Sequence, residues 1–304
     1  MIKEVLEKTE ALEEKIQALL AEEEKTEEIR VLQEEKKKLL ESCKDLEPGD
    51  RVFLARHPRR PHVEDFVSAL FTDFFEQKGD HLYDEDRSIY GGIARFHGRP
   101  VTVLGHRKGR TVEENLSCNF GMSCPEGYRK AKRIMEQAEK FDRPIITFVD
   151  TPGAYPGLEA EQHGQGEAIA KNLAFMSSLH VPVIAVVTGE GSSGGALGIC
   201  VANKILMLEN AIYSVLSPEG FATILWKDSS RAAEAAKVMK LTAKDLKEAN
   251  VADEVVPESL GGAQDDPESL YKALDQALEK TLAYYDGMSR HEIRKDRLSK
   301  FRNI

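Results

Sequence analysis

The first 47 residues place apolar residues at helical spacing within a densely charged stretch. The apolar positions are Ile2, Val5, Leu6, Leu12, Ile16, Leu19 and Leu20, followed by Ile29, Leu32, Leu39 and Leu40. Intervals of three, four and seven put each set on one face of a helix. The charged stretch 22–28 interrupts the pattern, and Thr26 can cap a second helix. The pattern predicts an antiparallel α-helical hairpin over residues 1–47, closed by Pro48 and Gly49; the alternative is a solvated charged arm.

Beyond the hairpin, apolar residues alternate between strand-like runs and helical periods. Residues 51–62, rich in Arg, His and Pro, are predicted to form a surface loop. The predicted helices are 63–77, 125–141, 165–179, 218–226, 229–239, 242–249 and 267–285. The predicted strands are 89–96, 101–105, 144–150, 181–188, 205–208 and 211–215. Strands that alternate with helices indicate an α/β layered domain over residues 48–304 with right-handed crossovers.

Composition limits the class of protein. The chain has 304 residues, 41% of them apolar and 31% charged, which is typical of a soluble globular protein. No apolar run approaches the ~20 residues that span a bilayer, and no signal region opens the chain, so a cytoplasmic protein is expected. The four cysteines, Cys43, Cys118, Cys124 and Cys200, form no CxxC pair, which fits a reducing compartment and argues against a zinc ribbon.

The net charge of −10 is concentrated at the start of the chain. Residues 1–47 hold 15 acidic and 9 basic residues, a net −6, which leaves −4 for the other 257 residues. An acidic balance disfavours nucleic acid as a partner. The last 16 residues, 289–304, run against this trend with six basic and two acidic residues. We interpret them as a helix end that meets an acidic neighbouring subunit, with a nucleic-acid patch as the alternative.

Two glycine-rich loops follow consecutive buried strands, where α/β sheets form their sites. In residues 189–198 (GEGSSGGALG), small residues at a strand-to-helix turn let the backbone approach a ligand and leave the first helical amides free to stabilise an oxyanion. Tight helix-on-sheet packing is the alternative. In residues 150–157 (DTPGAYPG), two prolines and two glycines fix a rigid surface, on which Tyr155 can offer a ring or a hydroxyl.

The first loop also matches G-x-S-x-G, the nucleophile-elbow pattern of hydrolases, with Ser193 at its centre. A serine hydrolase needs a histidine and an acid, and His163 or His180 can be proposed. Ser193 can equally cap the helix. The chain has no Walker loop, no HExxH, no cysteine–histidine metal set and no dinucleotide fingerprint after a first strand. The sequence therefore favours chemistry by backbone amides over an acid–base pair, with no metal on this chain.

Long blocks after residue 50 resemble the carboxyltransferase alpha subunit family of bacterial acetyl-CoA carboxylase. They are GGIARFHGRPVTVLGHRKGR (91–110), NFGMSCPEGYRKAKRIMEQAEKF (119–141), PIITFVDTPGAYPG (144–157), GEGSSGGAL (189–197), SVLSPEGFATILWKD (214–228) and ADEVVPESLGGA (252–263). The resemblance implies the crotonase (ClpP-like) fold of repeated ββα units. It also implies transfer of a carboxyl group from carboxybiotin, held on a biotin carboxyl carrier protein, to acetyl-CoA, which forms malonyl-CoA for fatty acid synthesis.

The family works as an assembly, so the resemblance implies partners. These are a zinc-containing beta subunit, generally in an α2β2 heterotetramer, together with biotin carboxylase and the carrier protein. The amides of Gly194, Gly195 and Ala196 would bind the ureido oxygen of biotin. Gly153, Ala154, Tyr155 and Ser193 would form the wall of the carboxybiotin site. Most coenzyme A contacts would come from the beta chain. A non-catalytic scaffold that docks through residues 1–47 is a third hypothesis.

Four positions depart from the family pattern. His81 stands in Gly79-Asp80-His81 where an arginine is expected, and Ser192 stands where a further glycine is common. Phe221 and Cys200 replace smaller or different residues. Ser192 adds a Cβ beside the predicted amide pocket, and His81 removes an ionic contact that the arginine could make.

Overall fold

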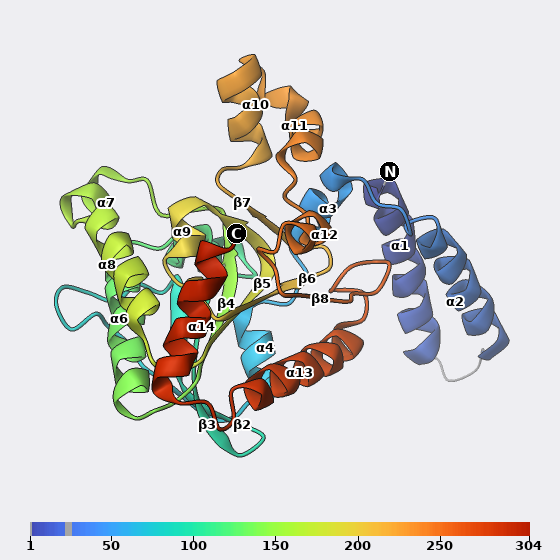
Figure 1. Ribbon diagram of the computed structural model, residues 1–304. Helices are drawn as coiled ribbons and strands as arrows, with labels where there is room; N and C mark the ends of the chain where they lie inside the picture. The colour runs from blue at the N-terminus through green and yellow to red at the C-terminus, as the bar shows by residue number, and fades with distance from the viewer. Residues whose placement is uncertain (1, 22–25) are drawn as a thin grey trace.

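The computed structural model describes residues 2–21 and 26–304, and its centre is one eight-stranded sheet (Figure 1). The sheet has the order β1-β2-β3-β4-β5-β6-β8, and β7 pairs with the end of β5. The strands are β1 (Thr72–Glu76), β2 (Ile89–Phe96), β3 (Arg99–His106), β4 (Ile145–Thr151), β5 (Val183–Ser192), β6 (Lys204–Leu208), β7 (Ile212–Ser214) and β8 (Glu254–Val256).

The direction of pairing divides the sheet into two parts. β1, β2 and β3 are antiparallel, whereas β3, β4, β5, β6 and β8 run parallel. Every residue of β4 and β5 is buried, as their uninterrupted apolar runs predict. The predicted pair of strands around the turn at 97–100 is confirmed. The carboxyl ends of the parallel strands therefore lie along one edge, where both glycine-rich loops begin.

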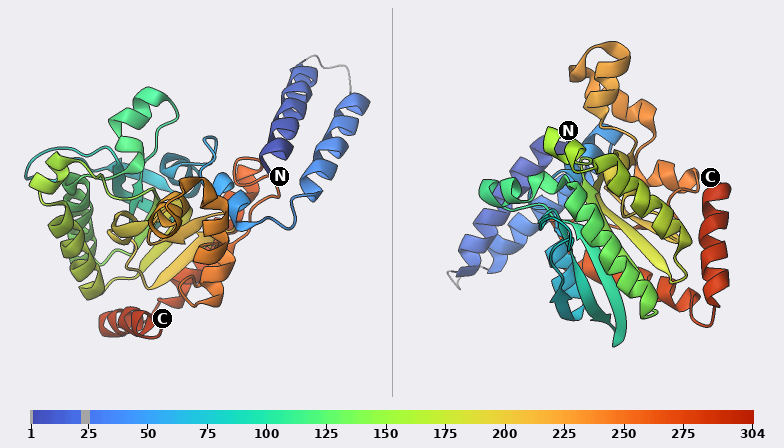
Figure 2. Two further views of the ribbon diagram at one scale, coloured as in Figure 1. Left: turned by 90° about the horizontal axis from the view of Figure 1, so that it is seen from above. Right: turned by 90° about the vertical axis from the view of Figure 1, so that its left-hand side faces the viewer.

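Helices cover both faces of the sheet (Figures 1 and 2). They are α1 (Ile2–Ala21), α2 (Thr26–Glu41), α3 (Pro48–Ala55), α4 (Val63–Leu70), α5 (Val112–Ser117), α6 (Pro125–Lys140), α7 (Leu158–Gln162), α8 (Gln165–Ser178), α9 (Ser193–Leu197), α10 (Pro218–Trp226), α11 (Ala232–Met239), α12 (Ala243–Glu248), α13 (Pro267–Tyr284) and α14 (Arg290–Arg302), with 3₁₀ turns at Asn119–Gly121 and Ser229–Arg231. Most of the helices predicted after residue 120 are confirmed to within one or two residues.

Two neighbouring residues of β4 show which helices pack on each face of the sheet. Phe148 stacks on Phe66 of α4 at 5.3 Å between ring centroids, and Phe66 meets Tyr271 of α13 edge-on at 5.6 Å. Thr147, one residue earlier, donates its hydroxyl to the carbonyl of Ile199, just after α9, at 2.8 Å. Because successive strand residues point to opposite faces, α4 and α13 lie on one face and α9 on the other.

Two predictions around the first helices of the domain are wrong. The helix predicted over 63–77 ends at Leu70, and Thr72–Glu76 instead forms the edge strand β1, because its backbone pairs with β2. The second concerns the surface loop at 51–62: Pro48, at the predicted boundary after the hairpin, begins α3, where its fixed φ suits the first helical turn. The loop predicted for 51–62 therefore contains part of a helix, and its Arg60 is buried.

The two N-terminal helices form the predicted hairpin and project from the body of the molecule (Figures 1 and 2). Its base is attached by an apolar cluster of Ile2, Leu6, Cys43 and Leu54. Residues 22–25 of the predicted charged interruption at 22–28, and the side chain of Thr26, lie outside the described residues. The division into domains at residue 48 stays a prediction, since the hairpin packs directly on α3.

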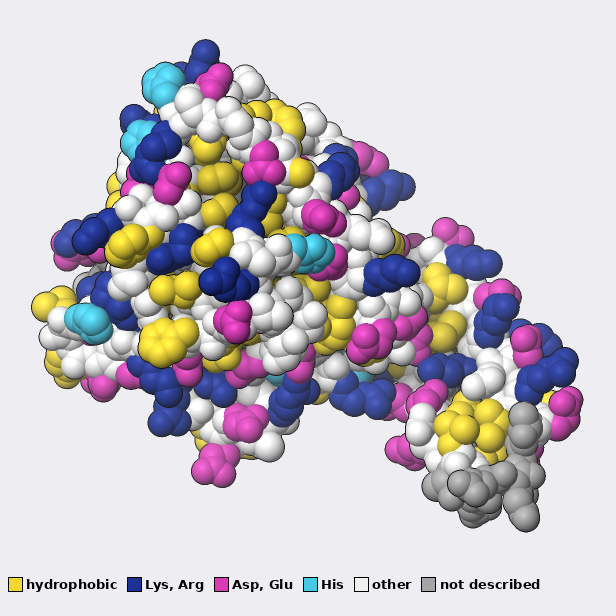
Figure 3. All heavy atoms as spheres, turned by 90° about the horizontal axis from the view of Figure 1, so that it is seen from below, with side chains coloured by type: hydrophobic (Ala, Val, Ile, Leu, Met, Phe, Trp, Pro, Cys, Tyr) yellow, Lys and Arg dark blue, Asp and Glu magenta, His cyan; other side chains and the backbone are white. Residues whose placement is uncertain are grey.

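The basic C-terminal segment is the helix α14, and much of its charge is used within the chain. Buried Arg297 donates to the carbonyls of Met176, Leu179 and Val181 at 2.6 to 2.9 Å. Lys300 pairs with Asp253 at 2.6 Å. Figure 3 shows basic and acidic side chains interleaved over the lower face of the molecule. These internal contacts weaken the interpretation of this segment as a nucleic-acid patch. Within the described ranges, no helix is long and apolar enough to cross a membrane.

Candidate active site at two glycine-rich loops

The structure brings the two glycine-rich loops into direct contact. β4 and β5 are parallel neighbours, and Thr151 at the end of β4 pairs with Gly191. Beyond them, a Cβ on Gly195 would lie 2.4 Å from the carbonyl carbon of Gly153 and 2.5 Å from the nitrogen of Ala154. No side chain fits at such distances, so residue 195 must be glycine for the loops to meet.

The short helix α9 begins at this contact. Its N-cap is Ser192, whose side chain makes no capping hydrogen bond. In an α-helix that begins at Ser193, the amides of Ser193, Gly194 and Gly195 have no intrahelical acceptor. By the same geometry the Ala196 amide is the first that can reach a carbonyl within the helix, that of Ser192, while Gly195 and Ala196 are both buried. Helix geometry therefore favours Gly194 and Gly195 as donors, and the three-residue set stays a prediction.

Ser193 lies at the rim of the site without a catalytic partner. Its φ of 57° is in the left-handed region, and its side chain is exposed. The two histidines considered as partners are engaged elsewhere: His163 contacts Glu126 and His180 contacts Glu139, each at 3.0 Å. Among the residues that the structure describes, none forms a hydrogen bond with the Ser193 side chain. The arrangement does not favour a serine hydrolase.

The second loop forms a fixed wall beside the amides. Gly153 has a φ of 150°, and its N–H donates to the Thr151 hydroxyl, which in turn donates to the Gly153 carbonyl at 2.7 Å. Tyr155 is half-buried, and its ring lies against Gly157, where a Cβ would be 2.3 Å from the ring edge. Gly153 and Ala154 thus lie directly against Gly195 of α9, and Tyr155 follows them in the same loop.

A buried ionic network underlies the same sheet edge, and the sequence reasoning missed it. Lys108 contacts Asp150 at 2.8 Å and Glu190 at 3.0 Å, and Arg56 joins Glu190 to Glu219. Burial opposes the charge on Lys108, but the two carboxylates outweigh it and raise the pKa of the ammonium. Burial would raise the pKa of Asp150, but Lys108 holds it below its ordinary value. The available signal was the position of Asp150 and Glu190 beside the glycine-rich loops.

His106 is a second feature near the loops that was not identified from the sequence. It ends β3 and is fully buried, and neither ring nitrogen has a hydrogen-bond partner within the described part of the chain. The ring lies near the Gly195 carbonyl, although no hydrogen bond of ordinary geometry joins them. Burial lowers the pKa of His106 to about 4, so the imidazole is neutral at physiological pH.

Comparison with known proteins identifies the family. Residues 2–304 match the family described as "Acetyl co-enzyme A carboxylase carboxyltransferase-like". The chain belongs to this family. The acetyl-coenzyme A carboxylase carboxyl transferase subunits alpha of Bacillus cereus and Bacillus cytotoxicus are each 52% identical to it over 280 residues, which cover 92% of this chain and 86% of theirs.

Solved structures of lower sequence similarity share the fold of this carboxyltransferase family member. Transcarboxylase 12S, with methylmalonyl-coenzyme A bound, aligns with a TM-score of 0.59 and 21% identity over 73% of this chain and 41% of its own. A Pseudomonas malonate decarboxylase hetero-tetramer in complex with coenzyme A aligns with a TM-score of 0.57 and 17% identity, covering 69% and 84% of the two chains. These neighbours confirm the predicted crotonase-type α/β fold.

The departures from the family pattern fall into two groups. Ser192 ends β5 beside the amides, where it is buried, and its hydroxyl has no partner among the described residues. His81 is exposed in a turn with a φ of 59° and forms no ion pair within the described ranges. Phe221 and Cys200 lie apart from the loop contact: Phe221 packs edge-on against Trp226 of α10, and burial raises the pKa of the Cys200 thiol to about 12.

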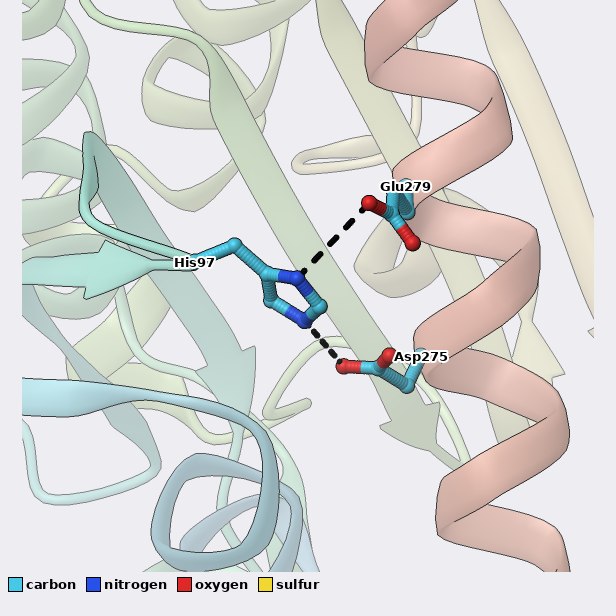
Figure 4. A group of neighbouring side chains, drawn as sticks. All are labelled: His97, Asp275 and Glu279. Atoms are coloured by element: carbon cyan, nitrogen blue, oxygen red, sulfur yellow. Dashed lines mark hydrogen bonds and ion pairs between the residues drawn. The ribbon is translucent and has the colours of Figure 1, made fainter.

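The carboxyltransferase-like chain has one group of potential metal ligands in its described part, far from the amides. His97, in the turn between β2 and β3, contacts Asp275 at 2.7 Å and Glu279 at 3.8 Å through its two ring nitrogens (Figure 4). Since β3 begins beside His97 and ends at His106, this group lies at the opposite end of the strand from the loop contact. It is a polar link between the hairpin turn and α13, made by the hydrogen bond between His97 and Asp275.

Proposed function

We propose that the chain is the alpha subunit of an acetyl-CoA carboxylase carboxyltransferase, which moves a carboxyl group from carboxybiotin to acetyl-CoA and yields malonyl-CoA. The contact of Gly195 in α9 with Gly153 and Ala154 carries the proposal, because it places the first amides of a helix beside a rigid loop. Membership of the family supports the same reaction. The product would enter fatty acid synthesis.

The Gly194 and Gly195 amides suit the chemistry that this reaction requires. When the bond between the biotin nitrogen and the carboxyl carbon breaks, the leaving ureido group gains negative charge on its oxygen. Two preorganised amides directed at that oxygen stabilise the charge, and losing one such donor typically costs roughly 3–4 kcal/mol. The biotin nitrogen then takes a proton from the acetyl methyl group. The resulting thioester enolate forms the new carbon–carbon bond with the carboxyl carbon.

Gly153, Ala154, Tyr155 and Ser193 would line the carboxybiotin site. Ala196 would support it from within the helix rather than by donating its amide. The Tyr155 ring can cover the flat ureido ring, and the exposed Ser193 hydroxyl can meet the substrate at the rim. The biotin belongs to a carrier protein, so it is a substrate here and not a resident cofactor.

The remaining parts of the reaction are assigned to partners. The relatives are named subunits alpha, which supports a beta subunit as partner. We propose that this zinc-containing beta subunit supplies most coenzyme A contacts and the oxyanion site of the thioester, within an α2β2 heterotetramer in the cytoplasm. The biotin carboxyl carrier protein and biotin carboxylase complete the system, with no metal on the alpha chain.

Reconstitution tests the proposal. The purified chain, a beta subunit of the family and a carboxylated carrier protein should together convert acetyl-CoA to malonyl-CoA, measured by transfer of labelled carboxyl. Each protein omitted in turn provides the control, and the chain alone should be inactive. Malonyl-CoA formation by the chain without the beta subunit, or none by the complete mixture, would refute the assignment.

A further inference from the structure

The direction of the α9 amides depends on a backbone with unusual conformational freedom, because Gly194 and Gly195 are adjacent and have no side chains. One backbone contact restricts Gly194 and another restricts Gly195. The Gly194 carbonyl accepts from the Gly198 N–H at 3.0 Å, and the Gly195 Cα lies against the backbone of Gly153. A third contact comes from a side chain: the Tyr128 hydroxyl donates to the Gly195 carbonyl at 3.3 Å. The direction is fixed, because a carbonyl can only accept.

Tyr128 holds the same helix a second time through its ring. It comes from α6, is fully buried, and lies so close to Gly198 that a Cβ there would be 2.5 Å from the ring edge. The Asn172 amide bridges the two residues by donating to the carbonyls of Tyr128 and Gly198, each at 3.0 Å. Burial also raises the pKa of Tyr128, so the phenol keeps the proton that it donates. Tyr128 thus contacts α9 at its central residue, Gly195, and at its C-cap, Gly198.

The chain just before α6 also holds the opposite wall. The carbonyl of Ser123 accepts from the Tyr155 N–H at 3.0 Å and from the Gln165 side-chain amide at 2.8 Å. That amide also donates to the Tyr155 carbonyl at 2.9 Å. The segment 123–128 therefore joins both loops of the site from behind. Its own side chains do not belong to the proposed binding wall.

We propose that Tyr128 is a positioning residue of the carboxyltransferase site, which holds the Gly195 carbonyl and Gly198 so that the Gly194 and Gly195 amides keep their direction. This inference rests on the proposed function of those amides. It adds a role for α6, which touches neither substrate in the proposal. Amides held in advance need not reorganise when charge develops, and small misplacements of such groups are costly.

Tyr128→Phe in the reconstituted complex tests the inference, because it removes the hydroxyl and leaves the ring beside Gly198. We expect kcat to fall about three- to tenfold with the KM of each substrate within about twofold, since only stabilisation of the transition state weakens. A second readout is the reverse transfer from malonyl-CoA to free biotin or to its analogue with sulfur at the ureido position. Sulfur accepts weaker hydrogen bonds than oxygen, so the unsubstituted complex should react faster with biotin than with the sulfur analogue. Tyr128→Phe should reduce this preference for oxygen.

Tyr285→Phe is the matched control. Tyr285 is also buried and donates its hydroxyl to Asp296 at 2.7 Å, beside Pro144 and Pro182 at the opposite end of the sheet. It should leave kcat and the oxygen preference unchanged. An unchanged kcat in Tyr128→Phe, an unchanged oxygen preference, or an equal loss in Tyr285→Phe would overturn the inference. Absence of carboxyl transfer in the unsubstituted complex would instead count against the proposed function.

Discussion

The Cα of Gly195 faces the backbone of Gly153 so closely that a Cβ would lie 2.4 Å from the Gly153 carbonyl carbon. This contact joins two loops that are about forty residues apart in sequence. It also places Gly195 directly against Gly153 and Ala154, two residues of the proposed wall. The geometry of the proposed site therefore requires that residue 195 has no Cβ atom.

Gly195→Ala should abolish most of the transfer activity. The added Cβ must separate the two loops, and a displacement near 1 Å at a catalytic group can cost about 100-fold in rate. Gly194→Ala is the comparison, since its Cβ would meet only Ile169 at an ordinary 3.7 Å. Carboxyl transfer by reconstituted complexes of equal composition would compare the two. Equal activities would contradict the importance of the loop contact.

Ser193→Ala should retain carboxyl transfer to within about threefold. Ser193 has no histidine partner in the described part of the chain, and its hydroxyl at the rim is only one wall contact in the proposal, worth roughly an ordinary hydrogen bond. Ser193→Gly should behave similarly and unfold at a slightly higher temperature, because glycine adopts a φ of 57° without strain. Activity and thermal unfolding would be measured together. Complete loss in both assembled variants would restore the hydrolase hypothesis.

The meeting of the two glycine-rich loops could be predicted from sequence because its signals are local. The apolar runs of β4 and β5 indicate buried parallel strands, and each leads directly into a glycine-rich loop. Adjacent parallel strands bring such loops to one edge. The preference among the amides was less accessible: only the observed start of α9 at Ser193 indicates that the Ala196 amide has an acceptor within the helix, which favours Gly194 and Gly195 as the proposed donors.

Features that depend on tertiary pairing could not be predicted. Phe66, Leu70 and Phe74 are spaced by four, but the last belongs to β1, because pairing with β2 overrides the helical period. Likewise, nothing in a single sequence indicates that Lys108 lies between Asp150 and Glu190, 42 and 82 residues away. The support that Tyr128 gives to Gly195 spans 67 residues and has the same origin.

Lys108→Met should destabilise the chain by about 3 kcal/mol, since removing one partner leaves buried carboxylates without their counter-charge. The side chains of Asp150 and Glu190 are only 9% and 8% exposed. Lys280→Met provides the control, because its pair with Glu254 is largely exposed and such pairs contribute about 0–1 kcal/mol. Urea unfolding of the purified variants gives both values. Similar midpoints would mean that the network at the sheet edge contributes little.

His106→Leu should make the stability of the chain less sensitive to acid. Burial lowers the pKa of His106 from an ordinary 6.5 to about 4 in the folded state. Between pH 4 and pH 6.5, His106 binds a proton in the unfolded chain but not in the folded chain. The contribution of a neutral His106 is therefore complete above pH 6.5 and is lost as the pH falls toward 4. At pH 5.5 the loss is about 1 kcal/mol.

Urea unfolding at pH 7.5 and 5.5 checks this expectation. His57 and His62 also have lowered pKa values through burial, so the decisive quantity is the change between the two pH values in His106→Leu relative to the unsubstituted protein. Because neither nitrogen of His106 has a hydrogen-bond partner in the described residues, leucine leaves no donor or acceptor unpaired, and the variant should fold at pH 7.5. Equal pH dependence in both proteins would show that His106 takes up its proton without unfolding the chain.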